Sequence, residues 1–284
     1  MNYRALLSKI LLAVTLGLTG HPAVAAATLE ATLAAQAAET RARYPARHPL
    51  ETLTFFGIKP GQHVIEALPG SGWYTKILLP VLGSEGRLTG ADYAFAMYPK
   101  FNFYSDEQIE AKKTWTTTWT AEAQTWRGDD GAAVDAFVFG SMPASLDGQA
   151  DAVLFIRALH NLARFEHDGG YLTTALAEAH RALKSGGIVG VVQHVAPESA
   201  ADSWADGSNG YLKKSFVIEK LTAAGFELVG ESDVNVNPRD QPTESDFVWR
   251  LPPSLATSKD DPEAAARYRA IGESSRMTLL FRKP

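Results

Sequence analysis

The residues best suited to chemistry lie where short apolar runs end. Glu66 closes the run that begins at Val64, and the turn Pro69-Gly70-Ser71-Gly72 follows within a few residues. Since glycine has no side chain, a ligand can lie against this turn and the backbone can take a positive φ. The segment from Trp73 predicts a helix, whose first N–H groups would donate to the bound molecule. Glu66 would accept a hydrogen bond from an amine or hydroxyl of that ligand; a structural strand–turn–helix corner is the alternative.

Asp92 ends the next apolar run, 20 positions after Gly72. A carboxylate at the end of the second strand of an α/β sheet can accept hydrogen bonds from both hydroxyls of a ribose. This placement suits a nicotinamide cofactor or another cofactor that contains adenosine. The early position of Glu66 and the paired strands expected near the C-terminus disfavour a nicotinamide enzyme. An ordinary loop aspartate is the alternative.

His160 and His194 each follow a predicted strand, and in open α/β sheets ligands bind outside the carboxyl ends of strands. His160 is placed to remove a proton from an acceptor hydroxyl or amine, because the ordinary pKa of histidine lies near the working pH. The pair could act as acid and base, or bind a metal with a third ligand. Because no metal-binding spacing supports the second hypothesis, we expect no metal; histidines held by backbone carbonyls are the structural alternative. The candidate third ligands are His167, Asp168 and Glu198.

Alternating strands and helices must position these residues. Such alternation predicts a parallel sheet with helices on both faces. Strands are expected from residue 64 and over 87–91, 136–139, 152–156, 188–192, 226–230 and 277–281. Helices are expected over 28–44, 48–57, 73–79, 171–183, 211–224 and about 262–271. No repeat or long linker divides the chain, so 26–284 is expected to be one domain.

Three motifs resemble those of class I S-adenosylmethionine-dependent methyltransferases. The first is Glu66 followed by a Gly-x-Gly turn, with Leu68 where that family's pattern has its first glycine. The second is Leu-x-x-Gly-Gly at 183–187, before the fifth strand. The third is Ala-Gly-Phe at 224–226, before the sixth strand.

Further stretches resemble, more narrowly, a family of predicted exported bacterial methyltransferases. They are Arg47-His48-Pro49-x-Glu51-Thr52-Leu53, the loop 69–75, and the ending Phe281-Arg282-Lys283-Pro284. The resemblance covers the chain from about Arg47 to Pro284, and no established substrate comes with it. Arg47 and His48 would lie at the entrance of the site, where they could cover the cofactor or an anionic acceptor. A surface salt bridge is the alternative role for Arg47.

The resemblance implies a Rossmann-like sheet of seven strands, mostly parallel, with helices on both faces and an antiparallel last strand. It implies S-adenosylmethionine as cofactor and methyl transfer to a small-molecule acceptor, with His160 on the acceptor side. His194, at the end of the fifth strand, is equally well placed. Arg157 and Asn161 would help to hold the ligand. The cofactor-binding residues that it implies are Glu66, Pro69, Gly70, Gly72, Tyr74, Asp92 and Asn161.

An aromatic-rich segment, 93–126, follows Asp92 directly. Trp115, Trp119 and Trp126 fall on one face of a predicted helix, a pattern typical of core packing. The alternative is an inserted lid over an acceptor pocket, which would suit an aromatic or apolar acceptor.

The N-terminus and the composition indicate an exported protein. Residues 1–25 have a basic start and a short apolar run, and they end in Ala23-Val24-Ala25, so they predict a signal peptide cleaved before Ala26. We therefore expect a periplasmic or secreted protein without stable membrane insertion. Without Arg4 and Lys9, 25 basic residues remain against 32 acidic ones, a net charge of −7 that disfavours a nucleic-acid partner. The absence of cysteine excludes disulfides and thiolate chemistry. The oligomeric state stays open.

Two functions from different classes remain at this point. The first is an S-adenosylmethionine-dependent methyltransferase. The second is an exported, non-catalytic ligand-binding module that has kept the fold. Leu68 in the cofactor loop and the predicted export from the compartment where the cofactor is made favour the second.

Overall fold

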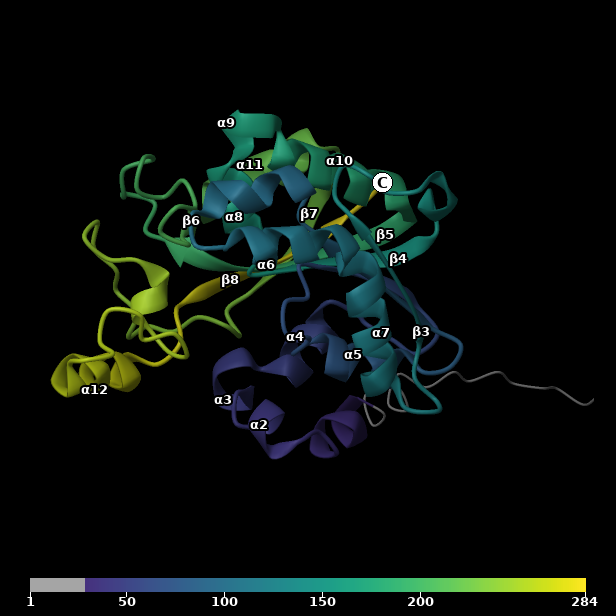
Figure 1. Ribbon diagram of the computed structural model, residues 1–284, viewed down its shortest axis with the longest axis horizontal. Coiled ribbons are helices and arrows are strands. Elements are labelled where there is room, and N and C mark those ends of the chain that lie inside the picture. The colour runs from purple at the N-terminus through teal and green to yellow at the C-terminus, as the bar shows by residue number, and fades with distance from the viewer. Residues whose placement is uncertain (1–28) are drawn as a thin grey trace, which may run out of the picture.

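A mixed sheet runs through the middle of the molecule, with helices on both of its faces (Figure 1). The computed structural model describes residues 29–284. Its strand order is β3-β2-β1-β4-β5-β8-β7, and β6 pairs with β5 off this path. The strands are β1 (His63–Ala67), β2 (Arg87–Asp92), β3 (Ala133–Val138), β4 (Ala150–Ile156), β5 (Leu183–Ala196), β6 (Leu212–Lys213), β7 (Glu227–Ser232) and β8 (Arg276–Arg282).

The predicted fold class is confirmed. Strands β1 to β5 pair in parallel, whereas β8 runs antiparallel to both of its neighbours, β5 and β7. The sheet has eight strands rather than seven, because the two residues of β6 pair with β5 at Val195 and Ala196. The helix expected from residue 211 consequently begins only at Lys214.

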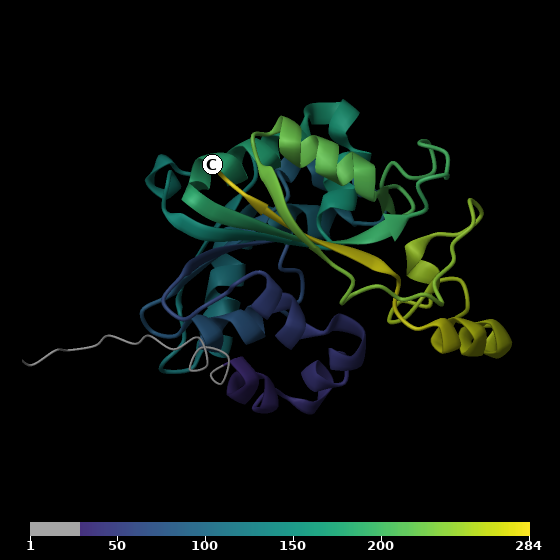
Figure 2. The same cartoon turned by 180° about the vertical axis from the view of Figure 1, so that it is seen from behind.

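The helices divide between the two faces of the sheet (Figures 1 and 2). One face carries the N-terminal helices with α5 and α7, and the other carries α8, α10 and α11. Besides a helical stretch at 29–34, the helices are α2 (Ala38–Arg41), α3 (Tyr44–Arg47), α4 (Pro49–Phe55), α5 (Thr75–Leu82), α6 (Asp106–Ala111), α7 (Trp115–Arg127), α8 (Leu159–Arg164), α9 (Glu166–Gly169), α10 (Tyr171–Ala182), α11 (Lys214–Ala223) and α12 (Pro262–Ile271).

The prediction of a single helix over 28–44 is wrong for the residues that the structure describes. The chain leaves the helical conformation at Ala37, where ψ is 151°, and then forms the short helices α2 and α3. Leu29, Leu33 and Tyr44 pack on the same apolar cluster, so the chain must turn between them. The predicted signal peptide, 1–25, lies outside the described residues.

Strand β1 separates two hydrophobic cores. All five of its residues are buried, and successive side chains alternate between the faces: Val64 belongs to the core under α4 and α5, and Ile65 to the core under α8 and α10. A central parallel strand is covered on both faces, which explains why Glu66 becomes buried despite its charge. No helix within 29–284 combines the length and the apolar character needed to cross a membrane.

Trp119 and Trp126 of α7 pack inward, as their spacing predicts, whereas the half-buried Trp115 stacks on Trp119. Trp119 is 2% exposed and lies against Gly90, where an added Cβ would come within 2.6 Å of its ring. Trp126 lies in the same way against Gly72. Helix α7 is thus the ordinary connection between β2 and β3 and packs on α5.

Candidate functional site

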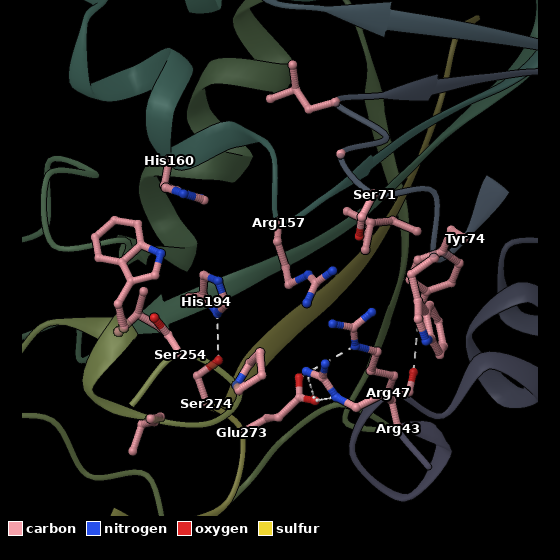
Figure 3. Close-up of a pocket in the computed structure, with 18 of the residues that line it drawn as sticks. Arg43, Arg47, Ser71, Tyr74, Arg157, His160, His194, Ser254, Glu273 and Ser274 are labelled. Carbon is pink, nitrogen blue, oxygen red and sulfur yellow. Dashed lines mark hydrogen bonds and ion pairs between the residues drawn. The ribbon is translucent and has the colours of Figure 1, made fainter. Parts of the chain in front are cut away.

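A cavity of about 380 Å³ opens at the carboxyl ends of β1, β4 and β5 (Figure 3). The strand order reverses between β1 and β4, and ligands of open α/β sheets bind at such a point. Five parts of the chain line it: the end of β1 with the loop after it, the end of β4 with the residues after it, His194 of β5, and two segments near the C-terminus. N-terminal arginines complete the wall. The lining includes Arg43, Arg47, Glu66, Leu68, Pro69, Gly70, Tyr74, Arg157, His160, His194, Val248, Trp249, Leu251, Glu273 and Ser274.

Leu68 adopts the backbone conformation that its position requires. Its φ is 54°, in the left-handed region where glycine is favoured, and its N–H donates to the Ala91 carbonyl at 2.7 Å. A non-glycine residue held there costs about 1–3 kcal/mol. The Leu68 side chain packs against the core under α8, and the cavity stays open beside it. The turn therefore keeps its shape without the family's first glycine.

The two glycines of the loop have different surroundings. Gly70, with φ 55°, lines the cavity together with Pro69. Gly72 does not line it: an added Cβ would lie 2.2 Å from the Trp126 ring, so the close approach of α7 requires this glycine. Tyr74 lines the cavity, is buried, and places its hydroxyl 3.5 Å from the Arg47 carbonyl.

Glu66 lies in the cavity wall as predicted. Its Oε2 accepts a hydrogen bond from Thr75 Oγ1 at 2.7 Å, and the carboxyl lines the cavity. Burial raises the pKa of this carboxyl to about 7, and the Thr75 hydroxyl and the Arg157 charge only partly oppose that rise. Glu66 can therefore accept a hydrogen bond from a ligand, and its charge changes near neutral pH.

Asp92 and Asn161 lie outside the cavity lining. Asp92 Oδ2 accepts a hydrogen bond from Tyr98 Oη at 2.5 Å and lies 3.5 Å from Lys112 Nζ. Asn161 Nδ2 donates to Tyr93 Oη at 2.8 Å. Side chains of the segment after β2, which includes the 3-10 helix η1 (Phe95–Phe101), thus already contact the carboxylate that was expected to bind ribose.

His160 and His194 come together as predicted, with ring centroids 5.6 Å apart. Gln193 fixes the tautomer of His160: its Nε2 donates to the Gly210 carbonyl at 2.9 Å, so its Oε1, 3.4 Å from His160 Nδ1, must accept. Nδ1 therefore carries the proton and Nε2 is the acceptor.

The premise of an ordinary histidine pKa is wrong. Burial and, secondarily, the Arg157 charge lower the pKa of His160 to about 4, although the Gln193 hydrogen bond opposes this. Burial and the neighbouring His160 lower the pKa of His194 well below its usual value, and His194 Nδ1 lies 2.5 Å from Ser274 Oγ. Both rings are neutral at pH 7.

Two of the three candidate third metal ligands have other contacts. Asp168 pairs with Lys100 at 3.3 Å, and Glu198 accepts from the Ser215 hydroxyl and N–H. Within 29–284, no three His, Asp or Glu side chains are grouped closely enough to hold a metal ion.

Sequence reasoning missed half of a charged cluster in the cavity wall. It considered Arg47 and Arg157 but not Arg43 or Glu273. Arg43 Nε donates to Glu273 Oε1 at 2.7 Å across 230 positions of sequence. The only local sign of this charged cluster is that basic residues recur at short spacing before α4. That spacing does not indicate a partner at residue 273.

Comparison with known proteins gives weak likenesses only. No family model matches the chain, and neither does any curated protein. Among solved structures, the cyclase SpnF is 20% identical with a TM-score of 0.49, over 84% of this chain and 80% of its own. A SAM-dependent methyltransferase from Aquifex aeolicus is 15% identical with a TM-score of 0.48, over 73% and 93%. An arsenic(III) S-adenosylmethionine methyltransferase from Chlamydomonas reinhardtii is 16% identical with a TM-score of 0.45, over 90% and 72%. The fold assignment therefore rests on the strand order and directions.

Proposed function

We propose that this protein transfers the methyl group of S-adenosylmethionine to a small-molecule acceptor. The observation that carries the proposal is the turn after β1, where Glu66, Leu68 and Gly70 line a cavity of about 380 Å³ at the reversal of strand order. Pockets of roughly 300–1,000 Å³ hold small ligands. The antiparallel β8 beside β5 agrees with the family that the sequence motifs resemble.

The cavity fits one end of this cofactor better than the other. The Glu66 carboxylate and the backbone of Pro69 and Gly70 suit the ammonium group and chain of its amino-acid end. Asp92, the expected ribose ligand, is bonded to Tyr98 and faces Lys112. A ribose that binds through Asp92 competes with both side chains for the carboxylate.

When bound, the cofactor supplies a methyl group activated by its positively charged sulfur. The protein holds the acceptor in line with that methyl and excludes water. His160 is the residue placed to take a proton from the acceptor, because its Nε2 is unprotonated at pH 7. A base this weak suits a proton that becomes strongly acidic as the new bond forms.

A specific observation also supports the alternative, an exported non-catalytic ligand-binding module. Tyr98, Lys112 and the Tyr93 N–H all contact Asp92, so its carboxylate is already occupied. A module that no longer binds the cofactor could keep this closed arrangement permanently.

Calorimetric titration of the purified protein with S-adenosylmethionine and S-adenosylhomocysteine separates the two functions. For the methyltransferase we expect both to bind, and Glu66→Gln to weaken binding on the order of tenfold through loss of one charge-assisted hydrogen bond. Glu122→Gln, an exposed change on α7, is the matched control. A folded protein that binds neither compound is the module instead.

Export is part of the proposal. It is supported by the basic start, apolar run and small-x-small ending of residues 1–25. Expression of the full chain in a Gram-negative host, followed by fractionation and N-terminal sequencing, should give a periplasmic protein that begins at Ala26. A cytoplasmic protein that retains residues 1–25 would refute it.

A further inference from the structure

The strongest feature of the cavity that the proposed function leaves unused is its group of arginines. Arg43, Arg47 and Arg157 line the cavity, and Arg276 lies behind them. Glu273 is the carboxylate they share: it pairs with Arg43, with Arg47 at 3.7 Å and with Arg276 at 3.4 Å. Three guanidinium groups thus share one acid, while that of Arg157 does not pair with it.

Arg47 is buried, and two of its guanidinium nitrogens lack a hydrogen-bond partner within 29–284. Its side chain is 6% exposed, and its Nε and Nη1 make no hydrogen bond with any residue in 29–284. Nε lies 3.7 Å from Glu273 Oε2, which is close enough for an ion pair and too far for a hydrogen bond. A buried donor left unpaired destabilises the fold, and a charged donor does so more.

Arg157 is half-buried in the cavity wall. Its backbone N–H donates to the Val192 carbonyl, and its guanidinium forms no hydrogen bond or ion pair with any residue in 29–284. Its φ is 59°, a strained backbone conformation of the kind that clusters at ligand clamps. In Figure 3 the guanidinium groups of Arg157 and Arg47 face each other, with the histidines on the far side of Arg157.

One part of the remaining wall is apolar. Val248, Trp249 and Leu251 come from the segment before α12, and Trp249 lies edge-on to His160 with ring centroids 5.8 Å apart. A ligand that fits both regions has an apolar or aromatic body and one anionic group.

We infer that the cavity binds a small organic acid, with its carboxylate or phosphate held by Arg157 and Arg47 and its apolar body against Trp249. An anionic group accepts hydrogen bonds from both guanidinium groups and relieves the repulsion between them. The inference deepens the proposed function by naming the acceptor class, and its anion-binding part can be tested without the cofactor.

The test compares phenylacetate, phenyl phosphate and neutral phenylacetamide as probes in calorimetric titrations of the purified protein. We expect at least one of the two acids to bind and the amide to bind at least tenfold more weakly, since only the acids can neutralise the arginines. The tighter of the two acids identifies carboxylate or phosphate as the preferred anion. An amide that binds as well as the acids, or a folded protein that binds no probe, overturns the inference.

Variants then locate the anion. Arg157→Gln and Arg47→Gln should each weaken binding of the better acid at least tenfold, and Arg157→Lys by less. Arg267→Gln is the matched control, because Arg267 is exposed on α12 and pairs only with Glu263. Equal losses in Arg157→Gln and Arg267→Gln would refute the assignment.

Repeating the titration with S-adenosylhomocysteine present separates acceptor from cofactor. Undiminished acid affinity supports an acceptor site beside the cofactor. Displacement of the acid shows that the arginines hold the cofactor's own carboxylate, which overturns the inference. If S-adenosylhomocysteine does not bind at all, the proposed function fails, while the probe and variant titrations still decide whether the anion site exists.

Discussion

Glu66 is the residue whose chemistry depends most on its burial. This carboxyl lies in the middle of a parallel sheet, where burial outweighs its hydrogen bonding to Thr75, so its protonated form is favoured. Glu66 therefore carries the negative charge that would bind a cationic ligand only as the pH approaches and passes 7.

Burial of Glu66 should make stability depend on pH. The folded protein raises its pKa from 4.5 to about 7, so the folded state binds the extra proton between these values. The stabilising contribution is complete below the lower value and is lost as the pH rises through the upper one. Between about pH 5 and 8, the free energy of unfolding should fall by roughly 3 kcal/mol relative to Glu66→Gln. Urea unfolding at both pH values measures this, and parallel curves for the two proteins would contradict it.

Leu68 should prove tolerable in the cofactor loop. Because its backbone is already left-handed and its side chain packs on the core, Leu68→Gly should change affinity for S-adenosylhomocysteine by no more than about threefold. Calorimetric titration of the two proteins is the measurement. A gain of ten times or more would show instead that the leucine obstructs the ligand.

At the scale of elements, the segment from β2 to α7 controls Asp92. Its aromatic residues Tyr93, Tyr98, Phe101 and Tyr104 pack on one another, and none of them lines the main cavity. The segment covers the end of β2 rather than an acceptor, so its position determines whether a ribose can reach the carboxylate.

Tyr98→Phe should release Asp92 for a ligand. Loss of the hydroxyl that donates to Asp92 removes a competitor, so affinity for S-adenosylhomocysteine should rise on the order of tenfold. Tyr104→Phe is the control, since its ring lies in the same cluster and its hydroxyl makes no hydrogen bond to Asp92. Unchanged affinity in Tyr98→Phe would show that Asp92 does not bind the ribose.

The contact between α7 and the cofactor loop depends on Gly72. In Gly72→Ala, the Cβ would collide with Trp126 at a residue whose φ is 75°, so unfolding should become easier by about 2–4 kcal/mol. Gly170→Ala separates the two causes: Gly170 has φ 65° and no atom within 4 Å of an added Cβ, so only about 1–2 kcal/mol is expected. Denaturant unfolding of both variants checks this, and similar losses would rule out the collision.

At the scale of the whole molecule, Glu273 joins the two ends of the chain. It pairs with Arg43 and Arg47, in the N-terminal helices, and with Arg276 at the start of β8. The cavity exists because these distant segments meet over the carboxyl ends of the strands (Figure 3).

Removal of the Glu273 charge should therefore destabilise the protein. Glu273→Gln leaves three arginines without their acid, two of them buried, and breaking a buried pair costs roughly 3–5 kcal/mol. The midpoint of denaturant unfolding should fall accordingly, whereas Glu263→Gln, at an exposed pair on α12, should leave it unchanged. An unchanged midpoint in Glu273→Gln would mean that the ends are held by packing alone.

The sequence alone determined seven of the eight strands, the Rossmann-like class and the convergence of Glu66, Gly70, His160 and His194 on one cavity. These follow from short-range rules: apolar runs form buried strands, and parallel strands bring the residues that follow them to one edge. The tertiary structure alone decided that Asp92 accepts a hydrogen bond from Tyr98, that Gly72 leaves room for the Trp126 ring, and that Arg43 donates to Glu273. Such contacts depend on where separate segments cross in space, and burial at those crossings sets the pKa values and unpaired donors, so no local pattern encodes them.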